Sequence, residues 1–389
     1  MKLFALGPTS QTDPGTPIGL GCQGCEFRDP CGGTTDFDCF ANCCGRPSQC
    51  TTACPRSHNF VAVLRDSGGF EIKRNWNIRQ GPDDLPAYIP HIKNGSGRIH
   101  SLAWPYVALT TFDVAAPDSE RVFAGPGELR RHFRISDNAQ VLLLSVGKDN
   151  RLERHWKYAE SRRLVEYLAS LGISHITAPN FSFPLDVPRP EHLVNRSRSL
   201  NQAERFAAAG LSVIPHVNAF NQTDWDNWRD FLRTHPHLSI VSQEFQTGLA
   251  SRRRACWHVW QLCNLEQSLG RGLRLLAIGG RRHLSLLVGL SSVTIADCVP
   301  FLRTCKRRRL DMSTGKWLVH RTGQGESLDH LLEQNIATYS DHVQARVSIL
   351  RQIGPLLPEL ELASVEESSD AHYVSELQLS LWRDPVAAR

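Results

Sequence analysis

The sequence lacks any apolar run long enough to cross a membrane, since no stretch approaches the length of about 20 residues that a spanning helix needs. Its opening, MKLFALGPTSQTDPG, has one lysine and only a few apolar residues, which is too short an apolar segment for a secretory signal. We therefore expect a cytoplasmic protein without membrane contact. Because the cytosol disfavours stable disulfides, the twelve cysteines need another explanation.

The chain also lacks the low apolar content of a disordered protein, and it has no strong net charge. With 389 residues, 41% apolar and 21% charged, it is long enough for one large domain or two with a sizeable core. The 44 Lys and Arg exceed the 39 Asp and Glu by only five, so total charge alone indicates no partner. The basic residues are grouped, however. A single run usually marks a solvated face, and three runs near expected strand ends weaken that interpretation. The runs are Arg252 to Arg254, Arg281 to Arg282 and Lys306 to Arg309.

Cysteine is concentrated near the start, where eight of the twelve lie between residues 22 and 54. This segment is rich in Gly, Asp, Pro and Thr and has little to bury, so thiolates that converge on a metal would supply its folding energy. Eight ligands suit two four-cysteine sites, of zinc or of an iron–sulfur cluster. They are Cys22, Cys25, Cys31, Cys39, Cys43, Cys44, Cys50 and Cys54.

The cysteine spacing does not decide between the two metals. Cys50-x3-Cys54-Pro55 is similar to the Cys-Pro end of a bacterial ferredoxin run, which favours an iron–sulfur cluster. The short C-x2-C of zinc ribbons occurs only once, and the cysteine triad of radical S-adenosylmethionine enzymes is absent. We expect residues 1–58 to be a metal-binding module with an iron–sulfur cluster or zinc, and a disulfide framework is the alternative.

From residue 60 onward, apolar β-branched runs alternate with amphipathic helical segments. Runs that are apolar along their whole length indicate strands buried on both faces, as in a parallel sheet covered by helices. Eight such units over about 250 residues match a (β/α)8 barrel, and a doubly wound open sheet is the alternative. We expect this α/β barrel over 59–322 and a helical extension over 323–389. The expected strands are 60–69, 106–113, 141–149, 175–182, 212–219, 238–245, 274–280 and 292–298.

Polar residues stand at the end of each expected strand, and in a barrel these ends form the active site. About half of them should be ordinary helix caps, because Asp and Asn favour that position. Carboxylates from strands 1, 2 and 8 would converge if the barrel closes, which is what acid–base and nucleophilic chemistry needs. The residues are Asp66, Asp113, Lys148, Asp149, Asn180, His216, Asn218, Gln243, Glu244, Arg281 and Asp297.

Three of these strand ends carry motifs of a known enzyme family. LRDSGGFEI resembles the TDSGGFQ signature of the tRNA-guanine transglycosylases, and IADCVPFLR is similar to their FDCVxPTR. YVALTTFDV also resembles the IxMxLDE strand of that family, and the three motifs follow in the family's order between residue 60 and about 310. The middle of the chain, from APNFSFPLDVPRP to GLSVIPHVNAF, resembles an uncharacterised phage-associated family.

The resemblance implies base exchange at an N-glycosidic bond in a barrel enzyme. Carried onto this sequence, it implies that Asp297 attacks C1′ of the nucleotide. We expect the neighbouring charges of Arg281 and Arg303 to keep Asp297 ionised. Asp66 would contact the base and transfer its proton, and Asp113 would read the hydrogen-bonding edge of the base.

The same resemblance implies a base pocket and cationic contacts to the phosphates. Gly68 and Gly69 would leave room for the flat ring. The expected substrate-binding residues are Ser67, Gly68, Gly69, Asp113, Lys148, Asn180, Gln243 and Arg281. The expected DNA-binding residues are Arg303, Lys306, Arg307, Arg308 and Arg309.

Departures from the family pattern concern the nucleic acid. The tRNA enzymes carry a C-x-C-x-x-C…His zinc site after the nucleophile, which Cys298 and Cys305 do not form, and no RNA-binding module is recognisable after residue 325. We therefore expect the DNA-directed branch: a glycosylase or transglycosylase acting on modified phage DNA, in antiphage defence. The alternatives are a non-catalytic nucleic-acid-binding barrel and a barrel hydrolase of a small molecule.

Overall fold

The computed structural model describes residues 52–353, except 55–56, 58, 71, 73–74, 95–96, 117, 119, 184–186, 188 and 321–326. Residues 354–389 and seven of the eight clustered cysteines lie outside the described residues: Cys22, Cys25, Cys31, Cys39, Cys43, Cys44 and Cys50. Cys54 is described and is a partly exposed free thiol. No helix in the described part of the chain is both long and apolar enough to cross a membrane.

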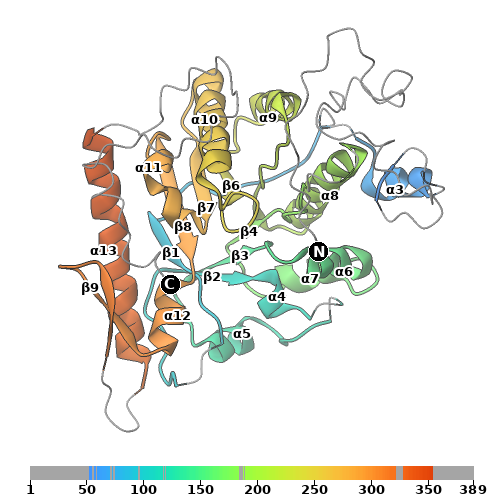
Figure 1. Ribbon diagram of the computed structural model, residues 1–389. Helices are drawn as coiled ribbons and strands as arrows, with labels where there is room; N and C mark the ends of the chain where they lie inside the picture. The colour runs from blue at the N-terminus through green and yellow to red at the C-terminus, as the bar shows by residue number, and fades with distance from the viewer. Residues whose placement is uncertain are drawn as a thin grey trace.

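Two four-stranded sheets, parallel throughout, form the centre of the fold (Figure 1). The first has the order β2-β3-β4-β5, and the second has the order β1-β8-β7-β6. In the first sheet the strands are β2 (Tyr106–Thr110), β3 (Gln140–Leu144), β4 (His175–Thr177) and β5 (Ser212–Ile214). In the second they are β1 (Tyr88–Pro90), β6 (Ile240–Glu244), β7 (Arg274–Ile278) and β8 (Ser292–Asp297).

Single parallel bridges join the edges of the two sheets. His91, just after β1, pairs with Ala108 of β2, and His216, just after β5, pairs with Ser242 of β6. The α/β class with parallel strands is therefore confirmed. Seven of the eight expected strands, from 106–113 to 292–298, overlap strands of the structure.

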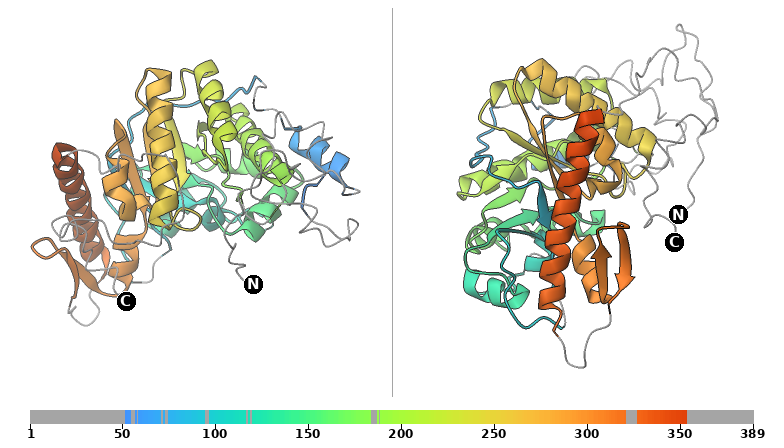
Figure 2. Two further views of the ribbon diagram at one scale, coloured as in Figure 1. Left: turned by 45° about the horizontal axis from the view of Figure 1, so that its top comes forward. Right: turned by 90° about the vertical axis from the view of Figure 1, so that its left-hand side faces the viewer.

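Helices lie outside the strands and connect them (Figure 1). They are α4 (Thr111–Val114), α5 (Pro126–Phe133), α6 (Asp149–Tyr158), α7 (Leu164–Ala169), α8 (Arg189–Ala208), α9 (Gln222–Thr234), α10 (Arg252–Leu269), α11 (Leu284–Leu287) and α12 (Val299–Cys305). A short 3₁₀ helix, η2 (Gly280–His283), follows β7. After α12 come the antiparallel hairpin β9 (Arg308–Asp311) and β10 (Lys316–Val319), then α13 (Asp329–Ile353), which packs against α12, β9 and β1 (Figure 2).

Alternate residues of each strand enter two different apolar clusters, because successive side chains point to opposite faces of a strand. On β7, Leu275 and Ala277 belong to a large cluster that includes most of the buried helix residues. Leu276 and Ile278 belong to a smaller one with Ile89, Leu142, Ile214 and Ala296. The large cluster lies between strands and helices. The smaller one lies on the opposite face of the strands, which we call the inner face.

The expectation of a strand over 60–69 is wrong, because this segment is helix α3 (Phe60–Ser67). One side of α3, with Phe60, packs against Leu193 and Val194 of α8, whereas Val61 is 67% exposed. Gly68, with φ 77°, ends the helix in the left-handed conformation that glycine adopts without strain. This capping role accounts for a glycine after Ser67, and the first strand of the sheets is the three-residue β1 instead.

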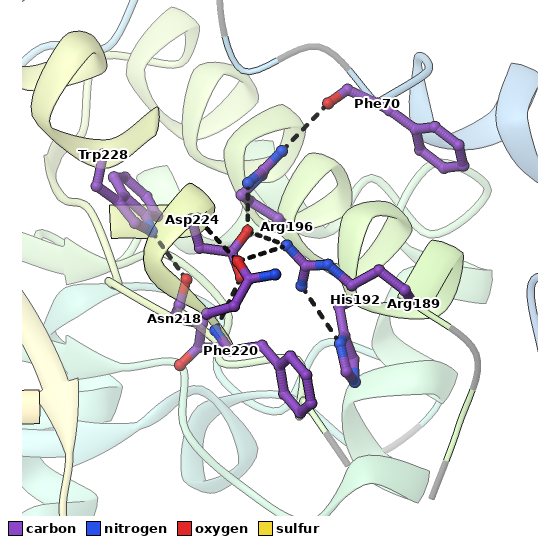
Figure 3. Close-up of polar contacts among 9 residues, drawn as sticks. Phe70, Arg189, His192, Arg196, Asn218, Phe220, Asp224 and Trp228 are labelled. Atoms are coloured by element: carbon purple, nitrogen blue, oxygen red, sulfur yellow. Dashed lines mark hydrogen bonds and ion pairs between the residues drawn. The ribbon is translucent and has the colours of Figure 1, made fainter. Parts of the chain in front are cut away.

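Buried charges fix α8 to α9 (Figure 3). Arg189 and Arg196 of α8 both donate to Oδ1 of Asp224 in the first turn of α9, at 2.5 Å and 2.7 Å. The other carboxylate oxygen accepts from the backbone N–H of Phe220 at 2.8 Å. Asp224 is fully buried, and Arg189 and Arg196 are 1% and 2% exposed, so α8 depends on this carboxylate to keep two guanidinium groups inside the protein.

Candidate active site at the carboxyl ends of β1, β2 and β8

His91 and Asp113 meet where β1 and β2 end. Nε2 of His91 lies 3.6 Å from Oδ2 of Asp113, and the side chains are 12% and 20% exposed. Asp113 is held in place by a capping box at the start of α4, in which the backbone N–H and hydroxyl of Thr110 donate to Oδ2 at 3.0 Å and 2.6 Å. The pair is thus a positioned, partly accessible carboxylate beside an imidazole.

Asp113 is ionised over the whole physiological pH range. Burial alone would raise the pKa of Asp113, but the contact with His91, the hydrogen bonds from Thr110 and the charge of Lys93 lower it to about 2. Lys93 is exposed and follows β1 by three residues. A carboxylate that keeps its charge next to an imidazole suits nucleophilic or electrostatic work.

We predict that Asp113 stabilises the fold by about 2 kcal/mol at neutral pH, since each pKa step below the unfolded value contributes about 1.4 kcal/mol. Its folded-state pKa is lowered, so the contribution is complete above pH 4 and is lost as pH falls from about 4 to about 2. Urea unfolding of the parent and of Asp113→Asn at pH 7, 4 and 3 measures this. A stability gap that stays constant down to pH 3 would contradict the prediction.

Asp297 lies at the end of β8, but its carboxylate faces the helices. Ile295 belongs to the large apolar cluster between strands and helices, whereas Ala296 lies on the inner face. Because side chains alternate along a strand, Asp297 points to the same side as Ile295. The hydroxyl of Tyr339 on α13 donates to Oδ2 at 2.7 Å, and that of Tyr88 on β1 donates to Oδ1 at 3.3 Å. The backbone N–H of Val299 also donates to Oδ1, at 3.0 Å, so both oxygens have partners.

The electrostatic setting of Asp297 differs from the expected one. Burial raises the pKa of this carboxyl, although the hydrogen bonds from Tyr339 and Val299 and the charge of Arg281 oppose the rise. Arg281 lies over the ring of Tyr339, with 5.2 Å from its guanidinium carbon to the ring centre. Arg303 lies instead over the ring of Trp317 in the hairpin, at 6.0 Å. Asp297 is 4% exposed, which gives a substrate no direct access to it.

Cys298 follows Asp297, and the charge of Asp113 also acts on its thiol. Burial raises the pKa of the Cys298 thiol, and the negative charges of Asp297 and Asp113 add to the rise while Lys93 opposes it. The thiol is therefore protonated at neutral pH and is a poor nucleophile.

The expected residues of the 66–69 segment lie apart from this site, on α3 at the edge of the molecule (Figure 1). Asp66 is exposed and accepts a hydrogen bond from the indole of Trp156 on α6, at 2.7 Å. Ser67 is buried and donates to the carbonyl of Leu64 at 3.2 Å, and Gly68 and Gly69 form the end of the helix. The structure therefore places Asp66 on a helix surface and not at a strand end beside Asp113.

The expected substrate-binding residues Lys148, Asn180 and Gln243 lie in three different environments. Lys148 is exposed at the start of α6, and Asn180, after β4, accepts a hydrogen bond from Asn218 at 2.8 Å. Gln243 is buried, and its side chain faces the helix layer, with Nε2 3.0 Å from Nδ1 of His258 on α10. Each of them follows or ends a strand, as expected, but their side chains do not form one cluster with Asp113.

The inner face of β5 and β6 carries a second polar pair. Nδ1 of His216 lies 3.1 Å from the hydroxyl of Ser242, and both residues are fully buried. Burial lowers the pKa of His216 to about 3, so the imidazole is neutral. Its Nε2 has no hydrogen-bond partner among the described residues.

The five expected DNA-binding residues lie on α12 and the β9–β10 hairpin, where Lys306 and Arg309 are exposed and the other three half-buried. Arg308 donates to the carbonyl of Trp317 at 3.3 Å, so part of this basic run holds the hairpin together. Arg307 has a φ of 50° and connects α12 to β9. The five residues are Arg303, Lys306, Arg307, Arg308 and Arg309.

Sequence patterns do not single out His91, Tyr88 or Tyr339. The segment YIPHIK is too short for a strand pattern, and Tyr339 lies on a helix 42 residues after Asp297. The polar His91 directly after an apolar tripeptide is the one local signal. Within the described ranges, no group of three or more His, Cys, Asp or Glu side chains is arranged to hold a metal.

No known family model matches the chain, and no curated protein is similar to it. The function is therefore argued from the site.

Proposed function

We propose that the two sheets close, through the bridges at His91 and His216, into a (β/α)8 barrel that cleaves the N-glycosidic bond of a nucleobase in DNA. The observation that carries the proposal is the His91–Asp113 pair at the carboxyl ends of adjoining strands, where barrel enzymes keep their active sites. Asp113 is the carboxylate that we assign to the attack on C1′, in place of Asp297, and His91 takes the proton-transfer role expected of Asp66.

The reaction follows from the two side chains. As the bond between C1′ and the base nitrogen breaks, its electron pair stays on the nitrogen, which takes a proton from His91 as the general acid. The charged Asp113 forms a bond to C1′ or stabilises the positive charge that develops there. Water or a second base then forms a bond to C1′, and the Asp113–C1′ bond breaks where one has formed. The proton that the water or the N–H of the incoming base releases goes to His91.

The nature of the substrate comes from the sequence motifs. The resemblance to the transglycosylases favours a purine-type base, and the loss of their zinc site favours DNA, with modified phage DNA and antiphage defence as our hypothesis. The cysteines between 22 and 54 would hold an iron–sulfur cluster or zinc, which metal analysis and the absorption spectrum of anaerobically purified protein distinguish. The basic residues from Arg303 to Arg309 and Lys93 would contact phosphates.

We expect the purified full chain to release free base from DNA that carries modified purines. Mass spectrometry of the small-molecule fraction measures the base, and heat-denatured protein is the control. Unmodified DNA of the same sequence shows whether the modification is required. If neither DNA yields base or exchanges a labelled base, at any pH between 5 and 9, the proposed activity is excluded.

A further inference from the structure

Two of the basic runs lie over neighbouring strands on the same side of the molecule. Arg252 to Arg254 begin α10, which follows β6, and Arg281 and Arg282 are in η2, which follows β7. β6 and β7 are parallel and paired up to their last residues, Glu244 with Ile278, so both loops leave the sheet at its carboxyl edge. We call these five residues the arginine rim: Arg252, Arg253, Arg254, Arg281 and Arg282.

The three rim arginines on α10 stand at the end of the helix where positive charge is unfavourable. The amino end of α10 carries the positive end of the helix dipole, where acidic side chains are stabilising and cations are not. Yet its first turn has three arginines and no acid, and only the Ser251 hydroxyl caps it, by accepting from the N–H of Arg254 at 3.3 Å. Such an arrangement costs stability unless an anion approaches.

Three of the five rim charges, those of Arg253, Arg254 and Arg282, are available to a partner. Arg253, Arg254 and Arg282 are exposed, and in the described part of the chain none of the three is paired with a carboxylate. His283, directly after Arg282, is 3% exposed. Burial and the charges of Arg252 and Arg282 lower the pKa of His283, while a backbone contact with Leu249 opposes this, so the rim concentrates positive charge near a buried imidazole.

We propose that the arginine rim binds the sugar–phosphate backbone of the nucleic acid. Guanidinium groups match phosphate oxygens with paired hydrogen bonds, and several of them along one edge suit a chain of phosphates better than a single anion. Arg308 and Arg303 in the α12–β9 run contact Trp317. Among the described residues, Arg253, Arg254 and Arg282 form no ion pair with a carboxylate, so their guanidinium groups are free to bind phosphate. The proposal rests on the proposed function only for the identity of the polymer.

The test removes three charges from the rim without touching the His91–Asp113 pair. Fluorescence anisotropy with a labelled unmodified 20-mer, single-stranded and duplex, is measured from 50 to 300 mM salt. For Arg253→Gln/Arg254→Gln/Arg282→Gln, we expect affinity to fall at least tenfold at low salt. The slope of log affinity against log salt should flatten by about 0.7 per arginine on the single strand and about 0.9 on the duplex.

The matched control removes three arginines elsewhere: Arg131→Gln/Arg162→Gln/Arg163→Gln, all exposed, with at most surface ion pairs to lose. It should bind like the parent. Equal losses in both variants, or none in the rim variant, overturn the proposal. Equally strong rim-dependent binding to anionic lipid vesicles or to polyglutamate overturns the nucleic-acid assignment.

Binding is measured without turnover, so the two proposals fail separately. If the rim variant binds DNA normally and still releases base, the proposal for the rim fails and the proposed glycosidic activity stands. If binding depends on the rim but no DNA yields base, the proposed activity fails and the proposal for the rim stands.

Discussion

Replacing Asp224 by alanine is expected to cost about 3–5 kcal/mol of unfolding free energy, the usual range when one partner of a buried ion pair is removed. The reason is the pair of guanidinium groups from Arg189 and Arg196, both of which rely on the Asp224 carboxylate while almost wholly buried (Figure 3). Without it, two positive charges would stay in the interior beside His192, whose Nδ1 lies 3.3 Å from Arg189.

Asp226 offers a matched control on the same helix. Its carboxylate pairs with Arg229 at 2.7 Å, but the side chain is 44% exposed, and exposed pairs contribute at most about 1 kcal/mol. Urea unfolding followed by circular dichroism compares Asp224→Ala and Asp226→Ala with the parent. Similar midpoints for the two variants would mean that water or another group neutralises the arginines.

The second large effect is on activity. We expect Asp113→Asn to lower the rate of base release by roughly 10²–10⁴-fold at pH 7, the range for removing one positioned catalytic group. The amide keeps the shape and the contact to Thr110, but it has neither the charge nor the nucleophilicity of a carboxylate. The rate is measured per folded molecule, from single-turnover release of base, because the variant also loses stability.

Asp297→Asn is the companion variant, since the sequence resemblance assigns the nucleophile there. The Asp297 carboxylate is enclosed by Tyr88, Tyr339 and the Val299 N–H, so the variant should lose up to about 3 kcal/mol of stability. Its base release per folded molecule should stay within a few-fold of the parent. If this variant is inactive while Asp113→Asn is active, Asp297 is the nucleophile and α13 must move to admit the substrate.

The strands could largely be predicted from the sequence, because apolar β-branched runs buried on both faces leave a clear pattern. The 60–69 segment has the same composition and is a helix, since α8 offers one apolar face at Leu193 and Val194 and only one side of α3 is covered. Local pattern cannot report such a partner more than 100 residues away. The strand that replaces it, β1, is only Tyr88–Pro90 and has too few residues for a period.

The position of the candidate site can be predicted in part, for the same physical reason. The sequence places Asp113 after an apolar run, but the contact to His91 and the Thr110 capping box, which decide its charge, depend on packing. Asp297 also follows an apolar run, but the alternation of β8 turns it towards Tyr339, a partner on α13 that no local motif indicates. Strand ends can be predicted from sequence, whereas the direction and neighbours of a side chain depend on packing.

The order of the strands has a consequence during synthesis. β2 to β5 follow one another along the chain and pair as neighbours, so that sheet can form as it leaves the ribosome. β1 pairs instead with β8, and Ile89 faces Ala296, which lies 207 residues later in the chain. Because a ribosome adds about 5–20 residues per second, β1 is without this partner strand for roughly 10–40 s. The last parallel pairing to become possible thus joins the first strand to the eighth, beside His91, so in a nascent chain the strand before His91 lacks its hydrogen-bonding partner until β8 has been made.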